Sequence, residues 1–175
     1  ESTLNRIDQH AGEEPDDAVA EFGIEALQEA LQAGEITAWF QPQVEFANGK
    51  VIGVEALARW ERPDGSLVRP CHFVPMMERE GLANALTDRM LDEACRWKQR
   101  WDHGGTRIKM SVNVSAVALA DPSAADRYQS IVEGRDIKPE EMILEISRAV
   151  KVSITTRSTT GLFSLSINVS RAIGP

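Results

Sequence analysis

Strand-type runs alternate with helix-period segments along most of this chain, and this alternation limits the folds open to it. The strand-type runs are rich in branched and aromatic residues and cover 37–46, 50–60, 108–114 and 142–146. Apolar residues at helical spacing cover 20–32, 84–101 and 121–133, and 70–81 is typical of a loop with a short helix. Strand, helix and strand in this order predict an α/β fold built on a parallel sheet.

The first two strand-type runs are predicted to pair with each other. They are separated by Ala47-Asn48-Gly49, and Asn-Gly between such runs is a strong signal for an antiparallel hairpin. The segment 84–101 repeats its apolar residues at steps of three and four, as a long amphipathic helix does. The four tryptophans lie on these periodic apolar faces, so we interpret them as core-filling side chains; they are Trp39, Trp60, Trp97 and Trp101.

The amino-terminal residues differ in composition from the rest. Glu13-Glu14-Pro15-Asp16-Asp17 is an acidic run that contains proline and has no apolar periodicity. We therefore expect a linker or tail over 1–20 and a domain over 21–175.

Charge and composition exclude several classes of function. The chain carries 19 Lys+Arg against 27 Asp+Glu, a net charge of -8, so a duplex nucleic acid is not an expected partner. No apolar run approaches the roughly 20 residues that span a bilayer, and residues 1–12 lack a signal-peptide pattern. Cys71 and Cys95 show no metal-binding or redox spacing, so we expect a reduced, cytoplasmic protein without a membrane span.

Three oxygen-bearing side chains stand at related places in the strand-type runs. Glu55 lies inside the second run, and Asn113 and Glu145 lie near the ends of the next two. The carboxyl ends of parallel strands meet around one crevice, where these groups could supply the oxygen ligands that a hard divalent cation prefers. Each residue taken singly is also explained as a partnered polar group, and it is their shared register that supports a metal site.

Two further side chains suit a phosphate ester. Arg59, four residues beyond Glu55, could fork onto phosphate oxygens or form a surface ion pair. Gln41 could hydrogen-bond a substrate or satisfy backbone groups. The three histidines show no mutual spacing, so we assign none of them a catalytic part.

Several short motifs occur in the order and rough spacing of bacterial EAL domains. They are Phe40-Gln41-Pro42, Gly53-Val-Glu-Ala-Leu-Ala-Arg-Trp60, Phe73-Val-Pro75 with Glu78 and Gly81-Leu82, Ser111-Val-Asn-Val-Ser115, and Ile143-Leu-Glu-Ile-Ser147. The chain thus resembles the EAL-domain family, whose members are similar to TIM barrels. They hydrolyse cyclic di-GMP to a linear dinucleotide, pGpG, using magnesium or manganese.

The resemblance implies a set of metal ligands and a set of substrate contacts. The metal ligands are Glu55, Asn113 and Glu145, and the substrate contacts are Gln41 and Leu57 for the nucleotide and Arg59 for its phosphate. It also implies a homodimer, and a receiver, sensory or diguanylate-cyclase domain upstream, since residues 4–12 resemble the end of a connecting helix.

The agreement with the family ends in the last part of the chain. Arg148 stands where the family has a second glutamate, and Asn168 and Val169 stand where it has a pair of aspartates. No lysine follows Lys151 to match the family's catalytic lysine, so no catalytic residue is assigned. An eight-stranded barrel takes roughly 250 residues, more than 21–175 supplies. We therefore expect the N-terminal portion of an EAL-type domain, an incomplete TIM-like barrel with a hairpin in front.

Three functional hypotheses stay open. The first is a metal-dependent cyclic di-GMP phosphodiesterase with weak or absent turnover, because ligands for a second metal ion and a general base are missing. The second is a catalytically inactive module that binds cyclic di-GMP or docks a protein. The third is a shortened or internally deleted piece of a longer, active enzyme.

Overall fold

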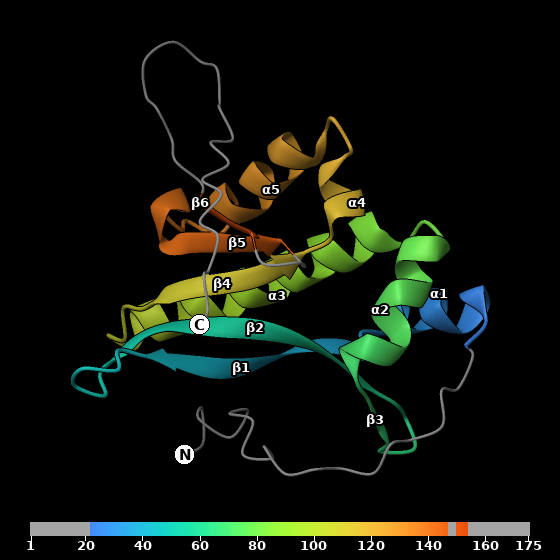
Figure 1. The fold of residues 1–175 in the computed structure, drawn as a ribbon, viewed down its shortest axis with the longest axis horizontal. Helices are drawn as coiled ribbons and strands as arrows, with labels where there is room; N and C mark the ends of the chain where they lie inside the picture. The colour runs from blue at the N-terminus through green and yellow to red at the C-terminus, as the bar shows by residue number, and fades with distance from the viewer. Residues whose placement is uncertain (1–21, 147–149, 154–175) are drawn as a thin grey trace, which may run out of the picture.

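The structure is a computed structural model, and it describes residues 22–146 and 150–153. The expected linker over 1–20 lies outside the described residues. So do Arg148 and the segment that contains Asn168 and Val169. The fold below is that of the described part of the chain (Figure 1).

Helices and strands alternate along the chain, as the apolar spacing predicts. The elements are α1 (Ile24–Ala33), β1 (Ile36–Val44), β2 (Val51–Glu61), β3 (Leu67–Val68), α2 (Pro70–Arg79), α3 (Ala83–His103), β4 (Lys109–Val114), α4 (Ala116–Leu119), α5 (Ala124–Glu133), η1 (Pro139–Glu141), β5 (Met142–Ile146) and β6 (Val150–Ser153). The expectation of a loop with a short helix over 70–81 is wrong in extent, because α2 takes up ten of these residues. Pro70 opens α2 at its first turn, where a missing N–H costs no hydrogen bond.

The strands form one mixed sheet in the order β1-β2-β4-β5-β6, with β3 paired to the end of β2. β2, β4 and β5 are parallel neighbours, as predicted, and β1 is antiparallel to β2. β6 is antiparallel to β5. Only residues 147–149 separate them, and a parallel crossover needs a dozen or more residues. Over residues 22–146 and 150–153 the sheet does not close, which agrees with the expected incomplete TIM-type barrel.

The β1–β2 hairpin forms at the predicted Asn-Gly turn. Gly49 has a positive φ of 68°, a conformation that residues with a Cβ rarely adopt. The amide N–H of Lys50 donates to Oδ1 of Asn48 at 2.8 Å. From this turn the two strands pair continuously to Ile36 and Trp60, apart from one irregularity next to Gln43.

The two faces of the sheet differ because successive strand residues point to opposite sides. One face, which we call the covered face, packs against helices and supplies the strand part of the core: Ile36, Ala38, Phe40, Val54, Ala56, Trp60, Met110, Val112, Val114, Met142 and Leu144. The other, which we call the open face, carries the alternate residues: Thr37, Trp39, Gln41, Glu55, Leu57, Arg59, Ser111, Asn113, Ile143 and Glu145. Figure 1 looks onto the open face, with α3 behind the strands.

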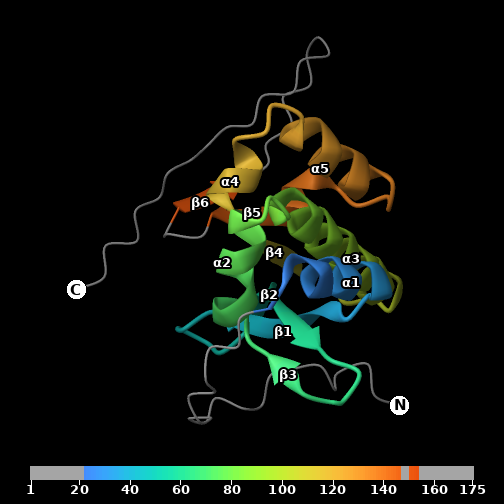
Figure 2. The same cartoon turned by 90° about the vertical axis from the view of Figure 1, so that its right-hand side faces the viewer.

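Helix α3 is the main support of the covered face. It contacts β1, β2 and β4 as well as α1, α2, α4 and α5, and Figure 2 shows it beside α1 and α5. Its buried residues recur at helical spacing, as in Leu86, Met90 and Ala94. None of the helices among the described residues combines the length and the apolar run that a bilayer crossing requires.

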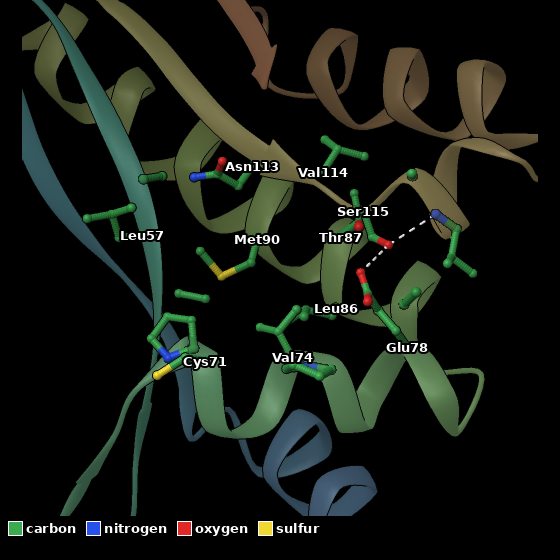
Figure 3. A pocket seen from close by; sticks show the side chains of 17 residues that line it. Leu57, Cys71, Val74, Glu78, Leu86, Thr87, Met90, Asn113, Val114 and Ser115 are labelled. Carbon is green, nitrogen blue, oxygen red and sulfur yellow. Dashed lines mark hydrogen bonds between the residues drawn. The ribbon is translucent and has the colours of Figure 1, made fainter. Parts of the chain in front are cut away.

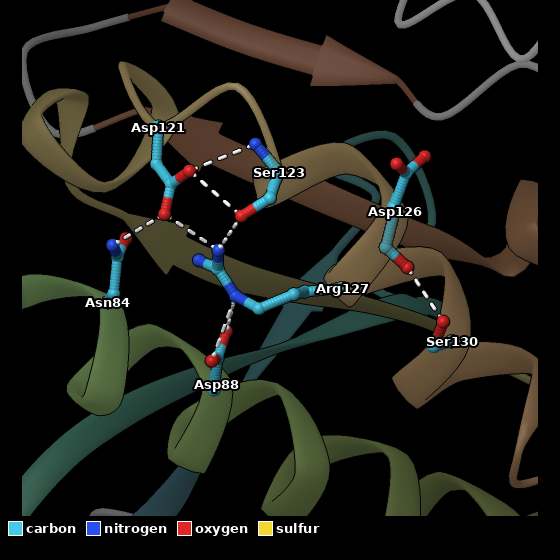
Figure 4. A network of polar contacts seen from close by, with 7 residues as sticks. All are labelled: Asn84, Asp88, Asp121, Ser123, Asp126, Arg127 and Ser130. Carbon is cyan, nitrogen blue, oxygen red and sulfur yellow. Dashed lines mark hydrogen bonds and ion pairs between the residues drawn. The ribbon is translucent and has the colours of Figure 1, made fainter.

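Charged groups fix α3 to its neighbours at both ends. Near its start, Arg127 of α5 bonds Asp88 of α3 and also Asp121 and Ser123, in the network of Figure 4. Near its end, the buried Nζ of Lys98 pairs with Asp102 at 3.0 Å and with Glu141 of η1 at 3.1 Å. These contacts hold α5 and the entry to β5 against α3.

The interpretation of the tryptophans is confirmed for three and wrong for one. Trp60 is buried in the core, and Trp97 and Trp101 pack against it. Trp39 is half-buried on the open face, since its neighbours Ala38 and Phe40 face the helices. It is therefore no part of the core.

Candidate functional site

Three of the predicted site residues lie on one face of β2. Glu55, Leu57 and Arg59 alternate with Val54, Ala56 and Trp60, which are buried on the covered face. The period of two therefore directs all three predicted residues to the open face. All three are only partly exposed.

Glu55 and Asn113 meet directly across neighbouring strands. β2 and β4 are parallel with Glu55 opposite Ser111, so Asn113 lies one step further along the same face. Nδ2 of Asn113 donates a hydrogen bond to Oε1 of Glu55 at 2.7 Å. Because the amide donates through nitrogen, its Oδ1 is left as an acceptor in the same place.

Glu145 continues this row on the next strand. It is the register partner of Asn113 in the parallel β4–β5 pair, and its neighbour Leu144 is buried on the covered face. Its side chain belongs to the open face and its Oε1 is shielded from solvent. The structure thus brings Glu55, Asn113 and Glu145 to one face of three adjacent strands.

The donor set fits a hard divalent cation in chemical type. Two carboxylates and one amide oxygen are ligands that such cations prefer, with water completing the shell. The described residues contain no group of three or more His, Cys, Asp or Glu able to hold a metal, and this set contains only two acids. A cation here would thus need further oxygen ligands, from water or a phosphate.

A pocket of about 660 Å³ opens beside this row. It lies between the carboxyl ends of β2 and β4 and the helices α2, α3 and α4 (Figure 3). Leu57 and Asn113 line both the pocket and the open face, and Val74, Leu86 and Met90 make much of its wall apolar. Such a concave, mainly apolar space with a few polar groups is typical of small-molecule sites.

One hydrogen-bonded pair joins α4 to α2 at the rim of the pocket. Oγ of Ser115 donates to Oε1 of Glu78 at 2.5 Å and accepts the N–H of Val117 at 3.1 Å. Ser115 thereby caps α4 and fixes it to α2. Both residues belong to the motifs quoted above, but their spacing in sequence gave no sign that they meet.

Gln41 and Arg59 occupy the same face as the row of oxygen ligands. Gln41 is exposed and is the register partner of Glu55. Nη1 of Arg59 donates to the carbonyl of Ala58 at 2.9 Å, and its guanidinium carbon lies 5.7 Å from the centre of the Trp39 ring. The sequence reasoning missed this contact, since it placed Trp39 in the core.

The two cysteines differ in their surroundings, and neither is in a disulfide. Cys71 is exposed and lines the pocket. Cys95 lies inside α3, where burial and then the charge of Asp92 raise the pKa of its thiol to about 12. Cys95 is therefore an unreactive core residue at neutral pH.

Comparison with known sequences finds a matching family and similar proteins. The EAL domain family matches residues 24–169. The bifunctional diguanylate cyclase/cyclic di-GMP phosphodiesterase MucR of Pseudomonas aeruginosa is 36% identical over 124 residues, which is 70% of this chain and 18% of MucR. The probable cyclic di-GMP phosphodiesterase PdeB of Escherichia coli is 29% identical over 121 residues, which is 69% of this chain and 23% of PdeB.

Solved structures show the same fold. The PaMucR phosphodiesterase in complex with c-di-GMP matches with a TM-score of 0.68 at 35% identity, over 72% of this chain and 51% of that chain. The FimX EAL domain from Pseudomonas aeruginosa bound to c-di-GMP matches with a TM-score of 0.61 at 22% identity, over 69% of this chain and 48% of that chain. This chain spans about half the length of these solved relatives and less than a quarter of the two curated ones.

Proposed function

Because this chain belongs to the EAL domain family, we propose that it binds cyclic di-GMP as an EAL-type phosphodiesterase domain. The reaction is metal-dependent hydrolysis of the cyclic dinucleotide to linear pGpG, with Mg²⁺ or Mn²⁺. One observation carries the proposal: Glu55, Asn113 and Glu145 share one face of three parallel strands beside an apolar pocket. A phosphodiester and a base could meet these two features at once.

The proposal assigns a role to each residue of the site. Glu55, Asn113 and Glu145 hold the cation, which when bound polarises the phosphate and lowers the pKa of a water molecule. Arg59 forks onto phosphate oxygens, as a planar guanidinium does. Leu57 lies against a base at the mouth of the pocket, and Gln41 hydrogen-bonds the nucleotide from β1.

Hydrolysis by the 175-residue polypeptide itself is proposed to be weak. Asn168 and Val169 stand where the family has two aspartates, and an amide and an alkyl group cannot replace two anionic ligands. The alternative is therefore a module that binds cyclic di-GMP or docks a protein without catalysis. This alternative is favoured because the first three proposed ligands are present, whereas neutral residues stand where the family has two aspartates.

The wider setting is proposed on the same basis. Residues 21–175 are the N-terminal portion of an EAL-type domain, and 1–20 are a linker from a receiver or sensory domain. We place the domain in the cytoplasm, where its two free cysteines stay reduced. We also propose a homodimer, because the outer strands of the sheet formed by the described residues favour pairing with a second copy.

Calorimetry and turnover together test the proposed function. Cyclic di-GMP is titrated into the chain with Ca²⁺, and hydrolysis to pGpG is followed separately with Mn²⁺. Glu55→Gln removes one proposed ligand, and Glu29→Gln, on the exposed side of α1, is the matched control. We expect the Kd for cyclic di-GMP to rise at least ten-fold in Glu55→Gln and to stay unchanged in Glu29→Gln.

Each outcome of this pair of assays decides something. Binding with slow turnover supports the impaired phosphodiesterase, and binding without any turnover supports the binding module. Ordinary turnover would show that the missing carboxylates are not needed. Absence of binding with Ca²⁺ and with Mn²⁺ would remove cyclic di-GMP as the ligand.

A further inference from the structure

Trp39 is held on the open face by a specific hydrogen bond. Its indole Nε1 donates to Oε1 of Glu61 at 2.8 Å, from β1 to the last residue of β2. Trp39 is the register partner of Leu57, four residues before Glu61. The indole therefore extends along the hairpin, past the position of Arg59, to reach this carboxylate.

Arg59 lies over the ring that this hydrogen bond fixes. Thr37 is the register partner of Arg59, so Trp39 is its diagonal neighbour on the same face, a spacing that long and aromatic side chains bridge. The guanidinium carbon is 5.7 Å from the ring centre, within the range of cation–π attraction. Nη1 of Arg59 also donates to the carbonyl of Ala58 at 2.9 Å, so the ring and this carbonyl together limit the orientation of the guanidinium.

The core does not explain this arrangement. Trp39 packs outside the buried cluster, whereas Trp97, which also donates to a glutamate and lies under an arginine, packs edge-on against Phe40 of the core. In Trp97 the ring is used for packing. The Trp39 side chain instead contacts neighbours on the open face, beside the proposed ligands. Its N–H bonds Glu61, and Arg59 lies over its ring.

We propose that Trp39 and Glu61 are positioning residues that set the orientation of the Arg59 guanidinium for the phosphate of the ligand. This inference rests on the proposed function for the identity of that ligand. Glu61 fixes the indole, the indole limits the rotamers of Arg59, and less side-chain freedom is lost when the phosphate binds. Trp39 and Glu61 themselves touch no reacting atom.

A double-mutant cycle on nucleotide affinity tests the coupling. We expect Trp39→Leu to raise the Kd for cyclic di-GMP in Ca²⁺ by up to about ten-fold, because the Arg59 side chain must then be ordered when the phosphate binds. Trp39→Phe, which keeps a ring, and Glu61→Gln, which keeps an acceptor, should change it less. In an Arg59→Ala background Trp39→Leu should have no further effect. Trp97→Phe is the matched control and should leave the Kd unchanged.

A second measurement reads Arg59 directly and needs no ligand. In a ¹⁵N-arginine-labelled chain, Arg59→Lys identifies the Nε–Hε signal of Arg59. We expect the indole ring current to displace this signal from that of a free arginine. Trp39→Leu should return it, while Trp97→Leu should move only the Arg100 signal.

The two measurements separate this inference from the proposed function. An unaltered chain that does not bind cyclic di-GMP contradicts the proposed function and removes the phosphate role of Arg59 with it. Binding with additive losses in the cycle, or an Arg59 signal indifferent to Trp39→Leu, overturns the positioning role alone. Coupled losses together with a displaced signal support it.

Discussion

The covered and open faces of the same sheet carry side chains of opposite character. On the covered face, apolar residues of every main strand are buried against helices, and the charge of Lys98 on α3 is neutralised by two carboxylates. On the open face, polar and charged residues alternate with them and gather next to a pocket. One backbone thus carries two sets of side chains with separate tasks. We expect substitutions on the covered side to change stability and substitutions on the open face to change binding.

The largest expected effect comes from a core aromatic. Phe73 is 0% exposed and packs edge-on against Trp60, so Phe73→Ala should lower the free energy of unfolding by about 3–5 kcal/mol. Phe46→Ala is the control, since Phe46 is 104% exposed, and should change it by less than about 0.5 kcal/mol. Urea unfolding of both variants gives the difference. Similar losses in the two variants would contradict the assignment of Phe73 to the core that covers the sheet.

The next effect concerns the buried charge of α3. Replacing both partners of Lys98, as Asp102→Asn with Glu141→Gln, leaves a buried ammonium without compensation and should cost about 3 kcal/mol. Lys98→Met should cost less, because the two carboxylates it leaves are partly exposed and can be hydrated. Urea unfolding compares the variants. A larger loss for Lys98→Met would show that the two carboxylates are destabilised more by losing the ammonium than the ammonium is by losing them.

A smaller effect on stability, with a clear effect on binding, is expected on the open face. Glu55→Gln keeps an oxygen that accepts the hydrogen bond of Asn113, so the free energy of unfolding should change by less than about 0.5 kcal/mol. The affinity for Mn²⁺, measured by calorimetry without nucleotide, should fall at least ten-fold. A loss of stability as large as that of a core variant would contradict the expectation that open-face substitutions change binding rather than stability.

The smallest effect is a change in pH dependence. The backbone N–H and then the hydroxyl of Ser123, together with Arg127, lower the pKa of Asp121 from 3.8 to about 2. A lowered pKa stabilises the fold above pH 3.8, and this contribution is lost as the pH falls from 3.8 towards 2. The Asp121→Asn variant should therefore have a lower free energy of unfolding than the unaltered chain above pH 3.8. This difference should shrink as the pH falls from 3.8 towards 2, and acid unfolding of both chains measures it. Ser123→Ala should show part of the same change, and a constant deficit would contradict this assignment.

The sequence predicted the site's placement better than the contacts around it. The sequence placed Glu55, Asn113 and Glu145 at related positions in three strand-type runs, and the structure brings them to one face because the period of a strand is two. Asn48-Gly49 located the hairpin, since few other residues adopt the backbone that its turn requires. What the positions bind could not be derived from spacing and came from the family resemblance.

Two errors have physical causes that local patterns do not reveal. The segment 70–81 was expected to be a loop with a short helix, yet a proline in the first turn, Pro70, is compatible with a helix and apolar packing of Phe73 and Met77 stabilises the rest of α2. Trp39 and Phe40 are consecutive in a strand, so one of them had to leave the core. Which one depends on the side that the helices cover, and that is settled by long-range packing.

Helix α3 links two distant parts of the molecule within one element. Its 21 residues extend over about 30 Å, with Thr87 in the pocket wall near one end and Lys98, paired with Glu141 of η1, near the other. The helix that forms part of the pocket wall is therefore the same helix that η1 anchors just before β5 begins.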